Sequence, residues 1–166
     1  MRLAIIADTH MPRGARALPA ACVERLRAAD LILHAGDFTA ASVLADLEAL
    51  GPPVRAVHGN VDEHELRMRL PSATLVRAGV ARIAIVHDAG ARDGRLARLR
   101  ARFPDADAVV FGHSHLPLHE RDEETGFQIF NPGSPTERRR APSHTMGVGR
   151  IGDDGSVDLE LMSLGR

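Results

Sequence analysis

The stretch LAIIADTH at residues 3–10 decides the fold of this 166-residue chain. Its first five residues are apolar without alternation, a pattern typical of a strand that is buried on both faces. A second apolar strand is expected at residues 31–34 and a third short strand at 54–57, with helices between these strands at about residues 19–29 and 40–50. A βαβαβ beginning of this kind predicts parallel strands with helices packed against them.

Beyond Pro71 the expected order of strands and helices changes. Its expected elements are, in order, a hairpin of residues 74–77 and 82–86, a helix at about 93–102, a buried strand at 108–111, and β-hairpins over 116–161. No linker, repeat or low-complexity tract separates the two halves. We therefore expect one domain over residues 1–166, of mixed α/β class, with two sheets packed face to face and helices outside.

Composition and charge narrow the class of partner. Hydrophobic residues make up 44% of the chain but aromatic residues only 3%, so the core is expected to consist of aliphatic side chains. The shortage of aromatic rings also removes the stacking platform of single-strand nucleic-acid binders. The net charge of −1 gives no global basic field, and the one dense basic run, residues 138–140, is expected to be a solvated loop rather than a phosphate or nucleic-acid contact. We therefore find no strong nucleic-acid signal.

The single cysteine and the first apolar run bear on localisation. Cys22 has no cysteine partner for a disulfide, which suits a reducing compartment, and its place in a predicted helix favours a buried side chain over a nucleophile. The apolar run at residues 3–7 is too short for a signal peptide or a membrane span, and no later segment qualifies. We expect a cytoplasmic protein with no membrane partner.

Three oxygen-bearing side chains follow the first three predicted strands. Asp8, Asp37 and Asn60 each lie just past the carboxyl end of a strand, which is where open α/β sheets bind their ligands. Each has a structural alternative when taken alone. Asp8 could form a turn, Asp37 could cap the helix that begins near Ala40, and Gly59-Asn60 is a common turn signal.

Histidines follow the later predicted strands. A lone histidine such as His87, at the end of strand 83–86, is more often structural than a ligand. The pair in Gly112-His113-Ser114-His115 favours metal binding, since two imidazoles directly after a buried strand are costly without a partner. The whole set is what two adjacent divalent cations sharing one carboxylate require, which points to phosphoester hydrolysis; its members are Asp8, His10, Asp37, Asn60, His87, His113 and His115.

In this order, the motifs D-x-H, G-D, G-N-x-D, H and G-H-x-H resemble those of the calcineurin-like metallophosphoesterase superfamily, over about residues 1–135. The size of the chain, the residue after Asn60 and the tetrapeptide at residues 131–134 resemble its small bacterial and archaeal phosphodiesterase branch, which also contains the eukaryotic retromer scaffold subunit. The resemblance implies a four-layer αββα sandwich of two mixed β-sheets flanked by helices.

The resemblance also implies a role for each ligand. One cation is expected to be held by Asp8, His10, Asp37 and His115, and the other by Asp37, Asn60, His87 and His113, with Asp37 as the bridge. The amide donor favours a hard ion, so we expect two Mn²⁺ ions, with Mg²⁺, Fe²⁺, Ni²⁺ or Zn²⁺ as alternatives. A hydroxide bridging them would attack the phosphorus of a small phosphoester in line, and Asn60 would stabilise the developing charge.

The sequence departs from the wider family at Val61, where many relatives have a histidine that protonates the leaving group. Valine has no proton to give, and general acid catalysis is worth about 10²–10⁴-fold, so easy leaving groups or another donor are expected. His58 is a candidate donor, with an exposed histidine of no role as the alternative. Asp62 is expected to orient a neighbouring imidazole, and Arg13 is a candidate for binding the substrate phosphate, with simple exposure as the alternative.

The leading hypothesis is a metal-dependent phosphodiesterase. The alternative is a catalytically weak protein-binding scaffold of the same fold, as in retromer, and a metal-binding regulatory module is a third hypothesis. The complete ligand set argues for the enzyme, because a scaffold needs no such donors. The substrate is not specified beyond a small phosphoester, and a homodimer is left open.

Overall fold

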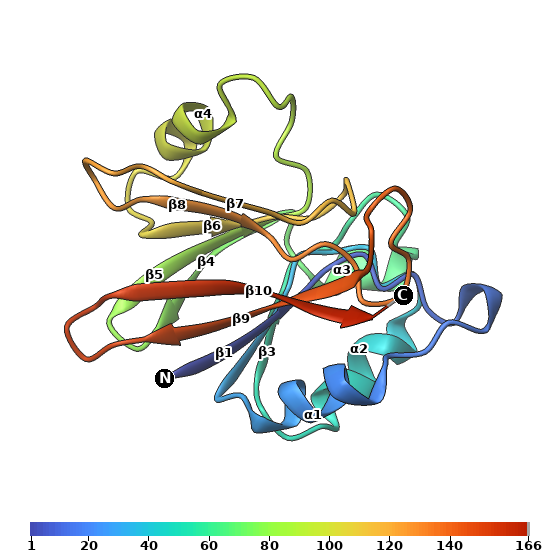
Figure 1. Cartoon of the computed structure of the whole chain (residues 1–166). Coiled ribbons are helices and arrows are strands. Elements are labelled where there is room, and N and C mark those ends of the chain that lie inside the picture. The colour runs from blue at the N-terminus through green and yellow to red at the C-terminus, as the bar shows by residue number, and fades with distance from the viewer. Residues whose placement is uncertain (166) are drawn as a thin grey trace.

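Two five-stranded β-sheets form the centre of the molecule, of which this computed structural model describes residues 1–165 (Figure 1). The first sheet contains, in spatial order, β10 (Val157–Gly165), β9 (His144–Ile151), β1 (Arg2–Ile6), β2 (Leu31–His34) and β3 (Val54–Ala56). The second contains β4 (Ala73–Ala78), β5 (Ala81–Val86), β6 (Ala108–Val110), β8 (Gln128–Asn131) and β7 (Leu118–Arg121). Both sheets are mixed. In the first sheet the parallel strands β1, β2 and β3 are followed on one side by the antiparallel β9 and β10, and in the second the parallel strands β5, β6 and β8 lie between the antiparallel edge strands β4 and β7.

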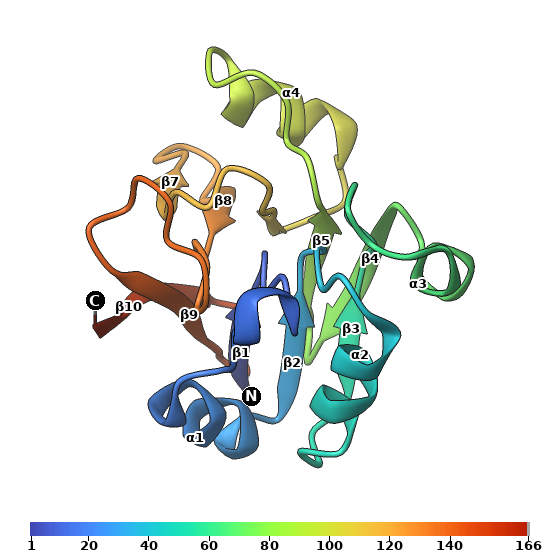
Figure 2. The same cartoon turned by 90° about the vertical axis from the view of Figure 1, so that its right-hand side faces the viewer.

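Helices cover the outer faces of the two sheets. Helices α1 (Ala20–Ala28) and α2 (Ala41–Glu48) lie against the first sheet, and α4 (Arg95–Arg102) lies over the second (Figures 1 and 2). The order helix, sheet, sheet, helix confirms the expected αββα sandwich. The short 3-10 helix η1 (Arg13–Ala15) and helix α3 (His64–Arg69) lie outside these layers. Within residues 1–165, every helix is too short or too polar to cross a bilayer.

The apolar run that opens the chain becomes the central strand β1. Leu3 and Ile5 face the core between the two sheets, whereas Ala4 and Ile6 face the core beneath α1 and α2. Both faces of the strand are covered, so residues 3–6 are all buried. This explains why the apolar pattern does not alternate with polar residues. Burying an isoleucine side chain stabilises the fold by roughly 1.5–3 kcal/mol. Cys22 is buried in α1, as expected.

Two features differ from the sequence-based expectation. Helix α3 was not predicted, since its six residues bury only Leu66 and show too little periodicity to be recognised. The last hairpin, β9 and β10, was predicted as strands but joins the first sheet, where β9 pairs antiparallel with β1. Local sequence patterns identify a strand but not its partner, because pairing depends on contacts far apart in the chain.

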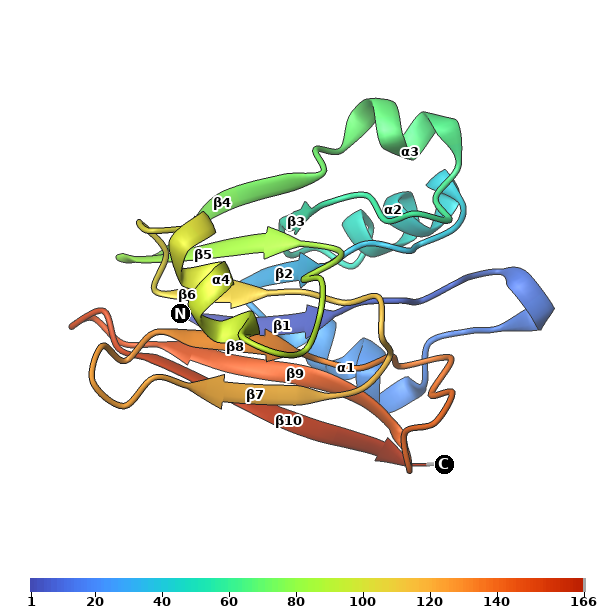
Figure 3. The same cartoon turned by 90° about the horizontal axis from the view of Figure 1, so that it is seen from above.

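The strand directions place the predicted ligands at one end of the sandwich. Strands β1, β2 and β3 run parallel in the first sheet, and β5 and β6 run parallel in the second. In Figure 3, β1, β2 and β5 point towards the same side of the molecule. The loops that follow these strands are tied together by backbone bonds from Asp8 to Gly36 and from Gly112 to His87. The carboxyl ends of both sheets therefore build one surface.

Candidate metal centre

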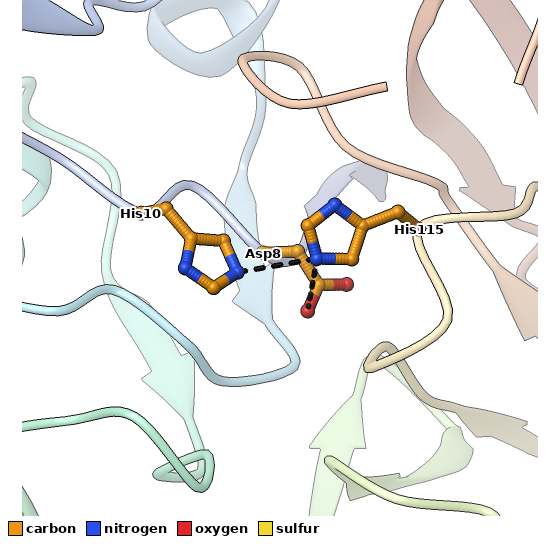
Figure 4. Close-up of side chains that lie close together, drawn as sticks. All are labelled: Asp8, His10 and His115. Carbon is orange, nitrogen blue, oxygen red and sulfur yellow. Dashed lines mark hydrogen bonds and ion pairs between the residues drawn. The ribbon is translucent and has the colours of Figure 1, made fainter. Parts of the chain in front are cut away.

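The side chains of the predicted ligands meet at the carboxyl ends of the strands. The Nε2 atoms of His10 and His115 are 3.2 Å apart, and His115 Nε2 is 3.6 Å from a carboxylate oxygen of Asp8 (Figure 4). Asp37 Oδ2 lies 3.6 Å from His10 Nε2 and 3.3 Å from His87 Nε2. Side chains from the loops that follow β1, β2, β5 and β6 therefore form one continuous cluster.

Asn60 and His113 complete this cluster on its solvent side. Asn60 Oδ1 lies 3.1 Å from His87 Nε2 and 3.1 Å from His113 Nδ1. Asn60 and His113 are exposed, whereas the other five predicted ligands are buried. The cluster thus has a closed floor and an open side through which a substrate can approach.

Backbone carbonyl groups orient two of the imidazole rings. His87 Nδ1 lies 2.8 Å from the carbonyl oxygen of Ala35, and His115 Nδ1 lies 2.5 Å from that of Glu137. A carbonyl oxygen only accepts, so each Nδ1 carries the proton and donates it. The lone pair of each Nε2 then faces the cluster, which is the usual support of metal-binding histidines.

The donor set fits divalent cations. The carboxylate oxygen Asp8 Oδ2 is buried without a hydrogen-bond partner in the described part of the chain. Possible ligand atoms of Asp8, His10 and His115 lie within 4.8 Å of one another, as do those of Asp8, Asp37 and His87. Converging oxygen and nitrogen lone pairs repel unless a proton or a cation lies between them. A cation would satisfy these atoms together.

The backbone of the ligand loops is strained. The φ angles of Asp8, His10, Asp37, His113 and His115 are 55°, 45°, 61°, 70° and 59°. Residues other than glycine are uncommon in this left-handed region, and each such residue costs about 1–3 kcal/mol unless its surroundings stabilise it. The strain is therefore concentrated on the residues that form the cluster.

Glycines let the ligands approach one another. A Cβ atom at Gly59 would overlap the Asp37 carboxylate. Gly36 has a φ of 90°, and a Cβ atom there would lie 2.8 Å from His87 Nδ1. These glycines are required because a side chain would push the ligands apart.

Asp62 supports the site in a different way from the one predicted. We expected its carboxylate to orient an imidazole, but it accepts hydrogen bonds from backbone N–H groups instead. Asp62 Oδ2 bonds to the N–H groups of Asp37 and Gly59 at 3.1 and 2.7 Å, and Oδ1 bonds to that of Thr39 at 2.7 Å. The buried Asp62 carboxylate thus joins the two loops that carry Asp37 and Asn60, because turns leave these donors without other partners.

The end of β8 and the segment that follows it are hydrogen-bonded to the ligand loops. Asn131 Nδ2 donates to the carbonyl oxygen of Gly112 at 2.9 Å. Ser134 Oγ donates to the carbonyl oxygen of Asp8 at 2.7 Å, and Thr136 Oγ1 donates to that of Thr9. The loops from both sheets are therefore fixed by a single segment from late in the chain.

Burial and pairing give the carboxyl groups opposite pKa shifts. Burial raises the pKa of Asp8 to about 7, although the charge of His87 acts against the shift. Burial also acts to raise the pKa of Asp37, but the hydrogen bond to His87 and the charge of His87 outweigh it and lower that pKa to about 2. Burial lowers the pKa of His87, and its bond to Asp37 more than reverses the effect. Without a cation, the contact between Asp37 and His87 favours the charged form of each group.

The other buried imidazoles are held neutral. Burial lowers the pKa of His115 to about 4, and it also lowers the pKa of His10. A neutral imidazole is the form that binds a metal ion, so these rings need not lose a proton on binding at neutral pH.

His58 and Arg13 do not join the cluster. His58 is half-buried, and its Nδ1 lies 3.2 Å from the carbonyl oxygen of Gly59 rather than against a predicted ligand. Arg13 is exposed in η1, and within residues 1–165 its guanidinium makes neither a hydrogen bond nor an ion pair. Their catalytic roles stay predictions.

The structure adds residues that the sequence did not single out. Glu137 Oε2 lies 3.7 Å from His10 Nε2, and Glu137 Oε1 bonds to Arg16 Nη2 at 3.0 Å. The positive charge of Arg139 lowers the pKa values of Asp8, His10 and His115, so the basic run at residues 138–140 is exposed, as expected, but borders the site. No sequence signal connected Glu137 and Arg139 with His10, because both lie more than 120 positions after it in the chain.

Comparisons with known proteins agree with this geometry. Residues 1–154 match the calcineurin-like phosphoesterase superfamily domain. A probable metallophosphoesterase of Methanothermobacter thermautotrophicus is 35% identical over 167 residues, which cover 99% of this chain and 94% of that protein. Vps29 of Entamoeba histolytica, solved with Zn²⁺, has a TM-score of 0.76 at 24% identity and covers 99% of this chain and 100% of its own. An archaeal phosphodiesterase has a TM-score of 0.73 at 18% identity, covering 98% and 100%.

We predict that Asp62→Asn destabilises the protein by about 1–3 kcal/mol, because the amide nitrogen cannot accept the hydrogen bonds that one carboxylate oxygen now receives. Urea unfolding in the presence of a chelator measures this change. Asp153→Asn, in an exposed turn, is the matched control and should be close to neutral. Equal stability of the two variants would show that Asp62 does not brace the loops.

We also predict a pH dependence that arises from His34. This buried ring lies 3.2 Å from Thr9 Oγ1, accepts from the N–H of Gly36 at 3.1 Å, and has its pKa lowered by burial to about 3. The unfolded chain binds a proton on this ring below about pH 6.5 and the folded protein does not, so stability is lost as the pH falls below that value.

The raised pKa of Asp8 acts in the opposite direction over part of this range, so the test isolates His34. In His34→Asn the amide oxygen can still accept from Gly36, but no titrating ring remains. Unfolding free energies with a chelator should therefore fall less steeply in the variant than in the wild type between about pH 6.5 and pH 4. Parallel pH profiles would contradict the prediction.

Proposed function

This chain belongs to the calcineurin-like phosphoesterase superfamily, and from that premise we propose that it is a phosphodiesterase that uses two divalent cations. The observation that carries the proposal is the convergence of carboxylate and imidazole ligand atoms at the carboxyl ends of the strands, together with a buried carboxylate oxygen, Asp8 Oδ2, that has no hydrogen-bond partner in the described residues. Divalent cations would satisfy the lone pairs of this set together. Its open side also gives a substrate access to the buried donors.

The contacts support an assignment of residues to two subsites. Asp8, His10 and His115 would hold one cation, and Asn60, His87 and His113 the other. Asp37 is the best candidate for the bridge, since its Oδ2 faces an imidazole of each subsite while its Oδ1 accepts from the N–H of Val61 at 3.0 Å.

Asp8 also lies close to Asp37 and His87, so distance alone would allow it to be the shared ligand. However, the N–H group of His113 donates to Asp8 Oδ1 at 3.1 Å, and the remaining oxygen is deeply buried. The oxygen of Asp37 that faces both subsites makes it the better bridge.

When bound, the two cations would supply a water of lowered pKa and positive charge for the phosphoryl oxygens. The protein positions the ligands, keeps His10 and His115 neutral, and leaves the amide of Asn60 at the open side, where a phosphoryl group can approach. Oxygen and imidazole donors favour Mn²⁺, with Mg²⁺, Fe²⁺, Ni²⁺ and Zn²⁺ as alternatives.

The surroundings of Val61 support a preference for diesters with good leaving groups. Its side chain carries no proton, and its N–H group is committed to Asp37. His58 makes no contact with the cluster in the described residues. A substrate whose leaving group departs without protonation therefore suits the site best.

Arg139 is a better candidate than Arg13 for binding the substrate phosphate. Its charge acts on three of the buried ligands, whereas Arg13 is exposed without a contact to the site. A guanidinium at the rim can donate two parallel hydrogen bonds to a phosphate without entering the cluster.

The proposed function predicts that chelator-treated protein regains hydrolysis of bis(p-nitrophenyl) phosphate when Mn²⁺ is added, with two ions bound per chain. Asp37→Asn keeps an acceptor for Val61 but loses the bridging charge. Its activity should fall by more than the roughly 10–100-fold typical of an outer-sphere change. Metal analysis together with a panel of phosphomonoesters and phosphodiesters measures both effects, and Asp153→Asn is the control.

Two outcomes would contradict this proposal. Full activity of Asp37→Asn would show that the bridge is assigned to the wrong residue. Absence of turnover with every divalent ion, in a folded protein, would favour the alternative of a protein-binding scaffold with the fold of Vps29.

A second prediction concerns the two arginines, Arg139 and Arg13, that are candidates for binding the substrate phosphate. Arg139→Gln should raise KM for the diester by about tenfold, in line with the loss of a charge-assisted hydrogen bond, and should leave cation affinity undiminished. Arg13→Gln should change KM by less than about twofold, because the structure shows no contact between Arg13 and the site. Steady-state kinetics on the Mn²⁺-loaded variants measures both. A larger effect of Arg13→Gln would reverse the assignment.

A further inference from the structure

Arg67, in α3, donates two hydrogen bonds to the loop that carries Asn60. Its Nε donates to the carbonyl oxygen of Asp62 at 2.9 Å, and its Nη2 donates to the carbonyl oxygen of Asn60. Arg67 is an exposed residue, and within residues 1–165 its guanidinium makes no ion pair with a carboxylate. The guanidinium is therefore committed to two backbone carbonyl groups of one ligand loop.

The peptide unit between Asn60 and Val61 is held at both of its ends. Its carbonyl oxygen accepts from Arg67, and its N–H group, which belongs to Val61, donates to Asp37 Oδ1 at 3.0 Å. The carbonyl and N–H groups of a planar trans peptide unit point in opposite directions. Bonds at both ends therefore fix the orientation of this unit, and with it the direction in which the Asn60 side chain leaves the backbone.

The Asn60 side chain depends on its backbone for its position. Its Oδ1 lies 3.1 Å from His87 Nε2 and 3.1 Å from His113 Nδ1, but the residue is exposed. In the described part of the chain, its amide nitrogen has no hydrogen-bond partner. An exposed side chain keeps its rotamer freedom, because no packing selects one orientation. The oxygen therefore faces the two imidazoles only as long as the backbone beneath it is fixed.

Helix α3 gives Arg67 a fixed base from which to reach this loop. The preceding residue, Leu66, is fully buried in the core beneath α1 and α2. The N–H group of Glu63, at the start of the helix, donates to the carbonyl oxygen of Thr39 at 3.1 Å. In Figure 3, α3 lies at the end of the molecule towards which β1 and β2 point. The helix thus brings the guanidinium to the end of the sandwich where the ligands meet.

We propose that Arg67 is a positioning residue for Asn60, which holds the amide oxygen where it faces His87 and His113. The inference rests on the two-cation site of the proposed function, in which these three residues hold one cation. Groups that orient a metal ligand typically change the affinity for the metal by about 10–100-fold. Arg67 therefore acts on the affinity of the cation at the exposed side and leaves that of the buried cation unchanged.

The first test measures cation binding rather than turnover. Calorimetric titration of the chelator-treated wild type with Mn²⁺ should show two ions. In Arg67→Gln, one of the two affinities should fall by about tenfold or more, while the other stays within about twofold. Arg69→Gln is the matched control, because Arg69 lies in the same helix but pairs with the carboxylates of Glu48 and Glu65, at 3.9 and 3.7 Å. The control should bind both ions as the wild type does.

A double-mutant cycle separates positioning from general support of the fold. Asn60→Ala removes the amide and should weaken the same ion. Because Arg67 acts through that amide, adding Arg67→Gln to Asn60→Ala should weaken the ion by less than about a further twofold. The visible absorption of the Co²⁺-loaded protein reports the coordination of the ion, and it should change in Arg67→Gln but not in Arg69→Gln. Unfolding of each variant in chelator measures any effect on the metal-free fold.

Arg67→Lys tests the contact at two points. Lysine keeps the positive charge, but a single nitrogen on a flexible chain replaces the planar fork that reaches both carbonyl groups. The affinity of this variant for the weakened ion should stay at least about threefold below that of the wild type.

Each result decides a different point. If the wild type binds two ions and Arg67→Gln binds both with unchanged affinity and an unchanged Co²⁺ spectrum, Arg67 does not position Asn60, and the proposed function stands. Losses that add in full in the double-mutant cycle would overturn the inference in the same way. Wild-type affinity in Arg67→Lys would show that a positive charge is sufficient and would overturn the contact at two points. If the folded wild type binds no divalent ion, the proposed function fails and this inference fails with it.

Discussion

The structure depends on one electrostatic constraint. Carboxylate and imidazole groups that repel one another must be held close together in the interior, with too few protons to pair all of their lone pairs. Asp8, Asp37 and the imidazoles of His10, His87 and His115 are all buried, and their lone pairs point towards one another. Left alone, such a group would move apart or take up protons, as the raised pKa of Asp8 and the pairing of Asp37 with His87 indicate. The surrounding structure holds these groups in place. The left-handed backbone angles, the glycine before each of two ligand loops and the Asp62 carboxylate keep the acceptors in position.

The αββα sandwich is suited to this task because it brings two sets of strand ends to one surface. The first sheet supplies the oxygen ligands and His10, whereas β5 and β6 of the second sheet supply the other histidines. Neither sheet holds a complete subsite, so the site exists only when the core between the sheets is packed. Hydrogen bonds from Asn131, the last residue of β8, and from Ser134, in the segment after it, then reach the loops of both sheets. The packed core therefore helps to hold the strained loops in position, since Ala7 and Ala35 at its edge directly precede two of them.

The sequence allowed prediction where the signal was local. An apolar run followed by a polar residue marked the strands and their ligands, because burial on two faces and a binding edge leave that pattern wherever they occur. The αββα order followed from the resemblance carried by those motifs. Helix α3 and the attachment of β9 to β1 could not be predicted, since the first is too short for periodicity and the second depends on distant pairing. For the same reason the roles of Asp62, Glu137 and Arg139 were missed or misassigned, because each acts on groups that only the folded chain brings near.

The two sides of the cluster differ in exposure, so the two proposed subsites would not be equivalent. His115 and Asp8 are fully buried, and their loops are fixed by carbonyl and hydroxyl groups of the segment after β8. Asn60 and His113 are exposed, so ligands can be exchanged on that side without opening the core. A phosphoryl group that approaches the cluster therefore meets the Asn60 side first. There the side chain nearest in sequence to Asn60 is that of Val61, which can exclude water but cannot donate a proton. The proposed preference for a leaving group that needs no acid therefore rests on one residue, Val61, whose side chain carries no proton and whose N–H group is bonded to Asp37.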